Sequence, residues 1–441
     1  MSLSMTRAIA KRALAAMLVA PIFFGALPAF GQDTASSIEA ASEQTALEMR
    51  SEQIVLFFNG EIEAEDVFTE GFLAAVPTEL LVATVDQWTA EHGAAMSVEG
   101  LNPVNDTRAG LDIRMERAIA RGGIAIDPTD ENRVSELVFR TFDTIDDSAD
   151  KISASLADLP GDVSVWFGPL DGGAPTISVN SDAQMPLGST FKLYVLAALA
   201  RDVAQGERSW DDVVTLDVTS FPSGMMQDWP QGSPVTLQTL ASLMISISDN
   251  TATDQLIAVL GREAVFQTLV ESGHSDPARN NPFMTTRELF LLKGGPSARL
   301  DTYAGGDADL RAEILAQIED TPVTLSEIGG AFADGPKAIN VEWFGNSGDL
   351  LNLFRFMRET ADPLAFDIMG INPSMLPATR ELWAYSGYKG GSEPGVLNLT
   401  WLLTDDDGRD HALVMSWSNP DANLAPNTLE GIAQRIQNLS Q

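Results

Sequence analysis

The sequence contains no cysteine and only three histidines, His92, His274 and His411. Without thiols the chain can form no disulfide, thiolate nucleophile or thiolate metal site. The histidines are far apart and belong to no paired motif, which argues against a zinc hydrolase. A Ser-His-Asp triad is not excluded by their number, but no Gly-x-Ser-x-Gly motif is present. We therefore expect structural histidines and neither a metal nor a cofactor.

Positive charge is also scarce, because 27 Lys and Arg residues stand against 62 Asp and Glu residues, for a net charge of −35. Nucleic acids and anionic membrane surfaces would repel such a chain, so neither is expected as a partner. A hydrophobic content of 44% indicates a globular protein. The 441 residues are enough for two or three domains, each with its own core.

Long apolar runs are lacking except near the N-terminus. Basic residues at Arg7 and Arg12 precede an apolar run over 13–27, and Ala29-Phe30-Gly31 has the small-x-small pattern of a cleavage site. Residues 1–31 therefore predict a cleavable signal peptide and a periplasmic or secreted protein without stable membrane insertion. An uncleaved anchor is the alternative, although the run is short for a span.

A polar linker (32–45) and a small first domain (46–147) are expected next. Helices followed by strands indicate an α+β domain. This element order resembles the cone-shaped fold of the ketosteroid isomerase family. Because the segment carries no acid/base constellation, a binding or oligomerisation module is favoured over a second active site. The predicted helices are 46–58 and 78–92, and the predicted strands are 110–118, 122–126 and 134–142.

Residues 148–441 are predicted to form a second α+β domain. Strands at 163–167 and 176–179 precede an apolar helix that starts near Ser189. A helical middle follows, in which 261–283 is expected to be irregular. The other predicted helices are 152–159, 236–247, 251–260, 284–293, 309–318, 342–358 and 428–439, and the C-terminal strands are 382–389, 396–404 and 411–417.

Ser189 and Lys192 stand three residues apart at the start of that apolar helix, so they share one face. A desolvated lysine amine can deprotonate a serine without histidine. The N–H groups and dipole at a helix start favour negative charge that develops there. A capping serine followed by a solvated lysine is the alternative, since Ser-x-x-Lys occurs often by chance.

Two later polar groups have both a functional and an ordinary interpretation. Ser248-Asp249-Asn250 lies at a break between two helices, as a polar corner of a cleft or as simple capping. Lys389-Gly390-Gly391-Ser392 ends a strand, where glycines would let a ligand approach the backbone beside a cation. The alternative is a protective lysine on an edge strand.

Together these three groups resemble the motifs of the class A β-lactamases and their penicillin-binding relatives, S-x-x-K, S-D-N and K-T-G, in the same order. The resemblance covers roughly residues 148–441. It implies an antiparallel sheet flanked by helices plus a helical subdomain, with the site between them. It also implies a hydrolase of β-lactams, as in antibiotic resistance.

The resemblance further implies a role for each catalytic residue. Ser189 would be the nucleophile that forms an acyl-enzyme, and Lys192 would be a base for its activation. Ser248 would pass a proton to the departing nitrogen. Asn250 would bind the substrate amide and brace the lysine, whereas Asp249 would be structural.

Substrate binding falls, by the same resemblance, to the Lys389 strand. Lys389 would attract a substrate carboxylate, and Gly390, Gly391 and Ser392 would line the substrate. The N–H groups of Ser189 and Ser392 would form the oxyanion hole. Gly390 departs from the family pattern, which has Thr or Ser there, so a hydroxyl is missing that Ser392 could replace.

A second departure concerns deacylation. Class A enzymes activate the deacylating water with a glutamate in a Glu-x-x-Leu-Asn motif, and no acidic residue between Asn250 and Thr285 lies in such a motif. Acylation should survive this loss, whereas rapid hydrolysis of the acyl-enzyme need not. The candidates for assisting the water are Tyr385, Tyr388, Asp276 and Glu393.

The leading hypothesis is a secreted serine hydrolase of the β-lactamase type that acts on β-lactams or related amides and esters through an acyl-enzyme on Ser189. The first alternative is a D,D-peptidase or esterase of the penicillin-binding superfamily, for which β-lactams are poor substrates or inhibitors. The second is a non-catalytic binder or sensor on the same fold. The retained nucleophile and both lysines argue against the binder.

Overall fold

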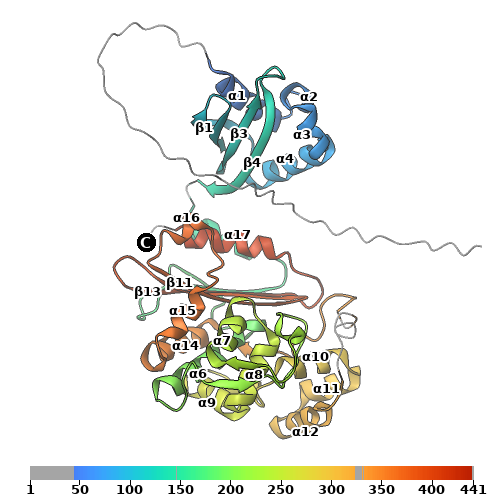
Figure 1. Ribbon diagram of the computed structural model, residues 1–441, viewed down its shortest axis with the longest axis vertical. Coiled ribbons are helices and arrows are strands. Elements are labelled where there is room, and N and C mark those ends of the chain that lie inside the picture. The colour runs from blue at the N-terminus through green and yellow to red at the C-terminus, as the bar shows by residue number, and fades with distance from the viewer. Residues whose placement is uncertain (1–43, 146, 323–329, 331, 440–441) are drawn as a thin grey trace, which may run out of the picture.

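The computed structural model describes residues 44–145, 147–322, 330 and 332–439. The predicted signal peptide (1–31) and nearly all of the predicted linker (32–45) lie outside these described residues. None of the described helices is long and apolar enough to cross a bilayer. The chain forms an N-terminal part (44–145) and a C-terminal part (147–439), each with its own sheet and core (Figure 1).

The N-terminal part places its helices before its strands, as predicted. The predicted helices 46–58 and 78–92 are confirmed, with two short helices between them. The first strand was not predicted, because its apolar residues do not alternate and its pairing shifts register three times. The elements are α1 (Ala46–Phe58), α2 (Ala64–Val67), α3 (Glu70–Ala75), α4 (Thr78–His92) and an antiparallel sheet of β1 (Ala95–Asn105), β2 (Arg108–Met115), β3 (Ala118–Asp127) and β4 (Arg133–Thr144).

Aromatic rings fill the space between these helices and their sheet. The Phe58 ring centroid lies 5.8 Å from that of Trp88 and 5.6 Å from that of Phe139. Phe68 is buried and stacks on Phe72, with the ring centroids 4.6 Å apart. The N-terminal part therefore has a packed aromatic core of its own.

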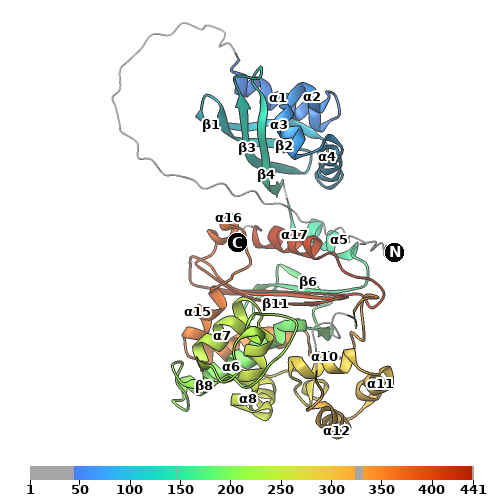
Figure 2. The same ribbon diagram turned by 45° about the vertical axis from the view of Figure 1, so that its right-hand side comes forward.

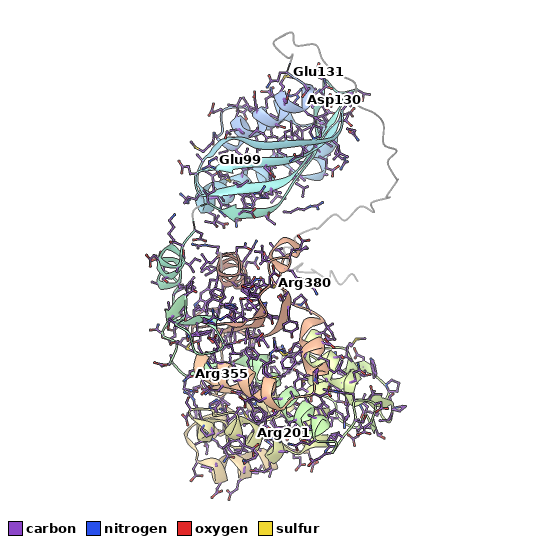
Figure 3. The ribbon with its side chains drawn as sticks, turned by 90° about the vertical axis from the view of Figure 1, so that its left-hand side faces the viewer. Glu99, Asp130, Glu131, Arg201, Arg355 and Arg380 are labelled. Atoms are coloured by element: carbon purple, nitrogen blue, oxygen red, sulfur yellow. The ribbon has the colours of Figure 1, made fainter. Side chains whose placement is uncertain are left out.

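The other face of this sheet is charged. Arg121 on β3 pairs with Asp112 on the neighbouring β2 at 2.7 Å, and Arg108 on β2 reaches across β3 to Glu136 on β4 at 2.6 Å. Figure 3 looks onto the strands, with Glu99 labelled on them. Helices thus cover one face of the sheet, and solvent-exposed ion pairs lie on the other.

The C-terminal part is built on one five-stranded antiparallel sheet in the order β11-β12-β13-β5-β6. The predicted adjacency of the three C-terminal strands is confirmed, and β5 pairs with β13, which joins the early hairpin to the end of the chain. The strands are β5 (Asp162–Pro169), β6 (Ile177–Val179), β11 (Tyr385–Glu393), β12 (Val396–Thr404) and β13 (Asp410–Ser418).

Helices cover both faces of this sheet (Figures 1 and 2). On one face, α5 (Ala149–Ala157) and α17 (Pro426–Gln437) pack through Ile152, Leu429 and Ile436 onto strand residues such as Trp401. The predicted helical subdomain covers the other face, around α6. Its elements are η1 (Gly188–Phe191), α6 (Lys192–Ala204), η2 (Met226–Asp228), α7 (Leu237–Ser246), α8 (Asn250–Leu260), α9 (Arg262–Glu271), η3 (Pro277–Asn280), α10 (Thr286–Gly294), α11 (Ser297–Gly305), α12 (Ala308–Ile318), α14 (Ser347–Thr360), α15 (Leu364–Gly370), α16 (Pro377–Arg380) and the paired short strands β7 (Met185–Pro186) with β10 (Phe344–Gly345) and β8 (Val213–Thr215) with β9 (Pro234–Thr236).

Two expectations for the helical subdomain were wrong. The segment 261–283, expected to be irregular, contains α9, whose buried Val265 and Leu269 are one turn apart. Glu342, expected to begin a helix, lies at a bend two residues before β10. The helix α14 begins only at Ser347, because the Asn346 side chain accepts the Asp349 N–H at 2.8 Å and forms a capping box.

Candidate active site

Ser189 lies on η1, one turn of 3-10 helix that runs directly into α6. The helix was expected to start near Ser189, but this first turn is 3-10 and the α-helix α6 begins at Lys192. The helix behind them is buried because its Leu, Val and Ala residues face the core on all sides. Lys192 is fully buried, whereas Ser189 is only half-buried. A rigid, apolar helix therefore holds both residues at its end.

Ser248-Asp249-Asn250 forms the corner between α7 and α8. Asp249 caps α8 by accepting the Ala252 N–H at 2.9 Å, and its other oxygen accepts the N–H groups of Met225 and Met226. This carboxylate is fully buried and structural in its contacts. Ser248 has a φ of +58°, a backbone state that is uncommon for residues other than glycine. The corner is thus fixed around a serine in a strained conformation.

The Ser248 hydroxyl lies between two buried lysine amines. Lys192 Nζ is 3.0 Å from Ser248 Oγ, and Lys389 Nζ is 3.1 Å from the same oxygen. Lys192 Nζ also donates to the Ser248 carbonyl and to Asn250 Oδ1, both at 2.7 Å. Asn250 Nδ2 donates to the Phe221 carbonyl at 3.0 Å, which fixes the amide. The structure therefore brings together residues from three distant motifs.

Neither lysine forms an ion pair with a described carboxylate. Burial lowers the pKa of Lys192 well below its usual value, and the charge of Lys389 lowers it further. Burial also lowers the pKa of Lys389 to about 7. Burial thus favours the neutral amine of Lys192 more than solvent would, and it leaves Lys389 partly protonated near pH 7. A neutral amine is what a lysine general base requires.

The Ser189 hydroxyl has no hydrogen-bond partner among the described residues, and Lys192 bonds to Ser248 and Asn250 instead. Catalytic hydrogen bonds are often long without substrate and tighten when it binds. The position of Ser189 at the mouth of this network is compatible with proton transfer to Lys192 once the serine rotates.

The edge strand β11 lies directly against η1. A Cβ built on Gly391 would overlap the backbone nitrogen of Ser189 and lie 2.7 Å from the Gly188 carbonyl carbon. A Cβ on Gly188, which has a φ of +49°, would lie 2.9 Å from the backbone nitrogen of Ser392. Two glycines thus bring the N–H groups of Ser189 and Ser392 together, which is the arrangement an oxyanion hole needs.

Tyr388 occupies the space above Gly390. Residues 388 and 390 share one face of β11, and a Cβ on Gly390 would overlap Tyr388 Oη and lie 2.8 Å from Cζ. The Tyr388 ring packs on Trp401 with its centroid 4.7 Å away. Burial raises the pKa of the Tyr388 phenol, so it stays a neutral hydroxyl. This ring, rather than Ser392, fills the place of the side chain that Gly390 lacks.

The structure also reveals a buried group that the sequence did not indicate. Lys293 Nζ lies 3.5 Å from Glu342 Oε1 and makes a short contact with Glu393 Oε1. Burial raises the pKa of both carboxyl groups, Lys293 lowers both, and the neighbouring Glu342 raises the pKa of Glu393 further. Glu393 Oε2 has no other partner among the described residues, so a proton shared with Glu342 satisfies it. The charge of Lys293 and one proton shared between Glu342 and Glu393 would together neutralise the two carboxyl groups.

The remaining candidates for assisting water lie elsewhere. Tyr385 donates to the Phe366 carbonyl at 2.7 Å, and Asp276 lies outside the residues that line the cleft. His274 is buried against the Phe344 carbonyl at 2.8 Å, and His411 bonds to Asp405 at 2.9 Å. No signal in a single sequence links Glu342 to the site, although it lies on the cleft wall.

These residues surround one cleft of about 400 Å³, a size that suits a small-molecule ligand. It runs along the edge of β11 from η1 to the start of α17. The polar residues of its wall include all the predicted site residues except Lys192, which lies behind Ser248. The lining comprises Ser189, Ser248, Asn250, Glu342, Tyr388, Lys389, Gly390, Gly391, Ser392 and Glu430, together with apolar side chains such as Ile245, Trp343 and Leu399.

Residues 147–308 match the model of a family described as "Beta-lactamase enzyme family". The similarity to this family is shown for that segment, which is less than half of the chain. The segment contains Ser189, Lys192, Ser248 and Asn250, whereas the strand that carries Lys389 follows it. No curated protein matches the chain.

The chain is also similar to solved structures of the β-lactamase and penicillin-binding type. PBP-A, solved as such and, for a mutant, as an acyl-enzyme complex with penicillin G, is 20% identical, with 65% of this chain and 93% of that chain covered and a TM-score of 0.45. A β-lactamase from Sphaerobacter thermophilus is 22% identical (66% and 93% covered, TM-score 0.45). One from Xanthomonas campestris is 15% identical (66% and 98% covered, TM-score 0.45).

Proposed function

We propose that the protein is a serine hydrolase that forms an acyl-enzyme on Ser189 and acts on β-lactams or related amides. The observation that carries this proposal is the Ser248 hydroxyl held 3.0 Å and 3.1 Å from two buried lysine amines beside the nucleophile. Such a cluster is costly to bury, because two like charges are desolvated together. Burying both lysines is explained if catalysis needs a neutral Lys192 as the base and a charged Lys389 to bind the substrate.

The acylation step follows from these positions. Neutral Lys192 takes the proton of the Ser189 hydroxyl while Oγ attacks the carbonyl carbon of the substrate. The N–H groups of Ser189 and Ser392 stabilise the oxyanion, each such donor contributing about 3–4 kcal/mol. As the C–N bond breaks, the proton passes from Lys192 through the Ser248 hydroxyl to the leaving nitrogen. The lysine is neutral again, and the acyl group stays on Ser189.

Substrate binding is assigned to the charged end of the cleft. Lys389 Nζ donates to the Gly390 carbonyl and to Ser248 Oγ, so its charge lies beside the backbone that would flank the substrate. A substrate carboxylate there would be held by this ammonium, and the Tyr388 hydroxyl lies in the cleft wall over Gly390, where it can contact another part of the substrate. The need for a carboxylate near the scissile amide matches the chemistry of penicillins.

A D,D-peptidase or esterase of the same superfamily is the second candidate, and one observation favours it. The carboxyl groups of the cleft wall are those of Glu342 and Glu430. Glu342 is held by Lys293 and by the Trp343 N–H at 3.1 Å, so it is engaged rather than free to activate water. A slowly deacylating enzyme would follow from this arrangement.

Intact-protein mass spectrometry with benzylpenicillin tests the proposal. We expect a mass increase of one penicillin on the purified protein and none on Ser189→Ala, with the adduct on the peptide that contains residue 189. Rapid loss of the adduct with nitrocefin turnover indicates a β-lactamase, and a lasting adduct indicates the second candidate. Absence of both adduct and turnover would refute an acyl-transfer function on these substrates.

We infer a binding or assembly role for the N-terminal part. Its interior is occupied by aromatic rings in mutual contact, including Phe58, Trp88 and Phe139. The element order of a cone-like α+β fold supports the same inference. Comparison of the oligomeric state with and without residues 44–145 by light scattering tests it, since an unchanged state argues against assembly.

A further inference from the structure

A second cavity, of about 180 Å³, lies behind the wall of the active-site cleft. Arg279 from η3 and Arg311 from α12 both line it, as does Tyr303 from α11. Glu342 and Trp343 line this cavity and the Ser189 cleft alike. One extended segment therefore separates a basic cavity from the nucleophile.

The two arginines have no carboxylate partner among the described residues. This is unusual in a chain with 62 acidic and 27 basic residues. Arg311 donates to the carbonyls of Tyr303 (3.2 Å) and Arg279 (3.3 Å), which anchors it to the backbone. The Arg279 guanidinium lies 3.4 Å from the ring centroid of Phe344 and donates no hydrogen bond within the described part of the chain. Its N–H groups are therefore available to a ligand.

The positive charges of the two arginines also repel each other. Burial lowers the pKa of Arg279, and the neighbouring charge of Arg311 lowers it further, while Asp276 has the opposite effect. Two half-buried cations are unfavourable when a nearby carboxylate offsets them only in part, and a bound anion would relieve both the desolvation and the repulsion.

We propose that Arg279 and Arg311 form a binding site for a small oxyanion, separate from the Ser189 cleft. A guanidinium presents paired N–H donors that fit carboxylate and phosphate oxygens. The cavity volume admits a group of that size and little more. The carboxylate in its lining, Glu342, is already engaged by Lys293 and the Trp343 N–H, which limits its repulsion of an anion.

An anion bound in this site should affect the active site through Trp343, which contacts η1. Its ring stacks on Phe191 of η1 at 3.6 Å, its Nε1 donates to the Met284 carbonyl, and its carbonyl accepts the Leu187 N–H at 2.8 Å. Because Met284 and Trp343 both line the basic cavity, a ligand there contacts the residues that position η1. We expect a bound anion to change tryptophan fluorescence and to raise the melting temperature.

Titration of the full chain with inorganic phosphate and, separately, with acetate tests the site. Calorimetry and fluorescence are recorded at constant ionic strength, with chloride as the balancing salt. We expect saturable binding of at least one of the two anions. Tighter binding of phosphate would identify a phosphate group as the natural ligand chemistry, and tighter binding of acetate would identify a carboxylate.

Three variants decide whether the arginine pair is responsible. Arg279→Gln removes a charge-assisted contact and should weaken binding about tenfold or more. Arg380→Gln removes an equal charge from an exposed position on α16 and should leave binding unchanged. Asp276→Asn removes the nearby negative charge and should tighten binding, a gain that misfolding cannot produce. Absence of saturable binding, or equal affinity of Arg279→Gln and the unchanged protein, would overturn the proposal.

Discussion

At the scale of single residues, the exchange of a threonine for glycine at position 390 is compensated by a tyrosine two residues earlier. Gly390 and Tyr388 point to the same side of β11, and the phenol lies where a side chain on 390 would begin. A hydroxyl is thereby kept over Gly390, although it comes from a different position in the sequence. The absence of a hydroxyl at position 390 could be predicted from the sequence motif. The position of the Tyr388 hydroxyl over Gly390 could not, because it depends on how the tyrosine ring is oriented in the folded protein.

Tyr388→Phe tests this compensation. Loss of the hydroxyl should raise the apparent dissociation constant for penicillin before acylation by about fivefold to tenfold, corresponding to about 1 kcal/mol for one hydrogen bond. The acylation rate constant at saturation should change little. Stopped-flow acylation kinetics separate the two constants. The double variant Tyr388→Leu with Gly390→Thr frees the space and restores a hydroxyl, so it should recover affinity. Unchanged affinity of Tyr388→Phe would show that the phenol only packs.

The ionisation of Lys389 predicts a pH dependence. Burial lowers its pKa to about 7, so the ammonium that attracts a carboxylate is present below that pH and is lost above it. The second-order rate constant for acylation by penicillin, which reports the free enzyme, should therefore fall as the pH rises through about 7. An ester substrate without a carboxylate is the control. It should lack this falling limb, and an equal fall for both substrates would contradict the assignment.

At the scale of elements, the decisive contact is between β11 and η1. Both are backbone surfaces, and Gly188 and Gly391 let them meet without side chains between them. The geometry of the oxyanion hole is therefore a property of two elements rather than of the serine alone.

Gly391→Ala tests this contact. The added methyl group would overlap the Ser189 nitrogen, so β11 must move away from η1 and the paired N–H groups must separate. Acylation should slow by about 100-fold or more, the effect of losing one oxyanion donor. Gly431→Ala on α17 is the matched control, because its added methyl meets no atom within 4 Å. Penicillin acylation followed by mass spectrometry measures both variants, and near-normal acylation of Gly391→Ala would exclude the proposed oxyanion hole.

Element-level comparison also shows where sequence reasoning succeeds and fails. Ser189, Ser248 and Lys389 could be proposed from the sequence because each lies in a short polar motif. The expectation that Lys389 ends a strand was wrong, since β11 continues to Glu393. The Lys293, Glu342 and Glu393 group was not, because its members are 49 and 100 residues apart and meet only after folding. Helix α9 was missed because its apolar residues do not gather on one face: Val265 and Leu269 are buried, whereas Val270 is exposed.

At the scale of the whole molecule, the two parts have separate cores. The residues packed around Phe58 and Leu111 belong wholly to the N-terminal part, and those around α6 and the five-stranded sheet belong wholly to the C-terminal part. The chain entering the C-terminal part is fastened within it, because Asp147 accepts Arg435 Nε at 2.7 Å. Each part exceeds 100 residues, which is enough for an independent core.

This separation predicts that residues 147–441 fold and form the acyl-enzyme without the N-terminal part. Every residue assigned to acylation, from Ser189 to Ser392, lies in the C-terminal part. Deleting residues 44–145 should therefore change the acylation rate by no more than about twofold, because distant, independent sites contribute additively. Calorimetry of the full chain should show two unfolding transitions, of which the fragment retains one. A fragment that is unfolded by circular dichroism, or folded but unable to acylate, would mean that the N-terminal part completes the active unit rather than accompanying it.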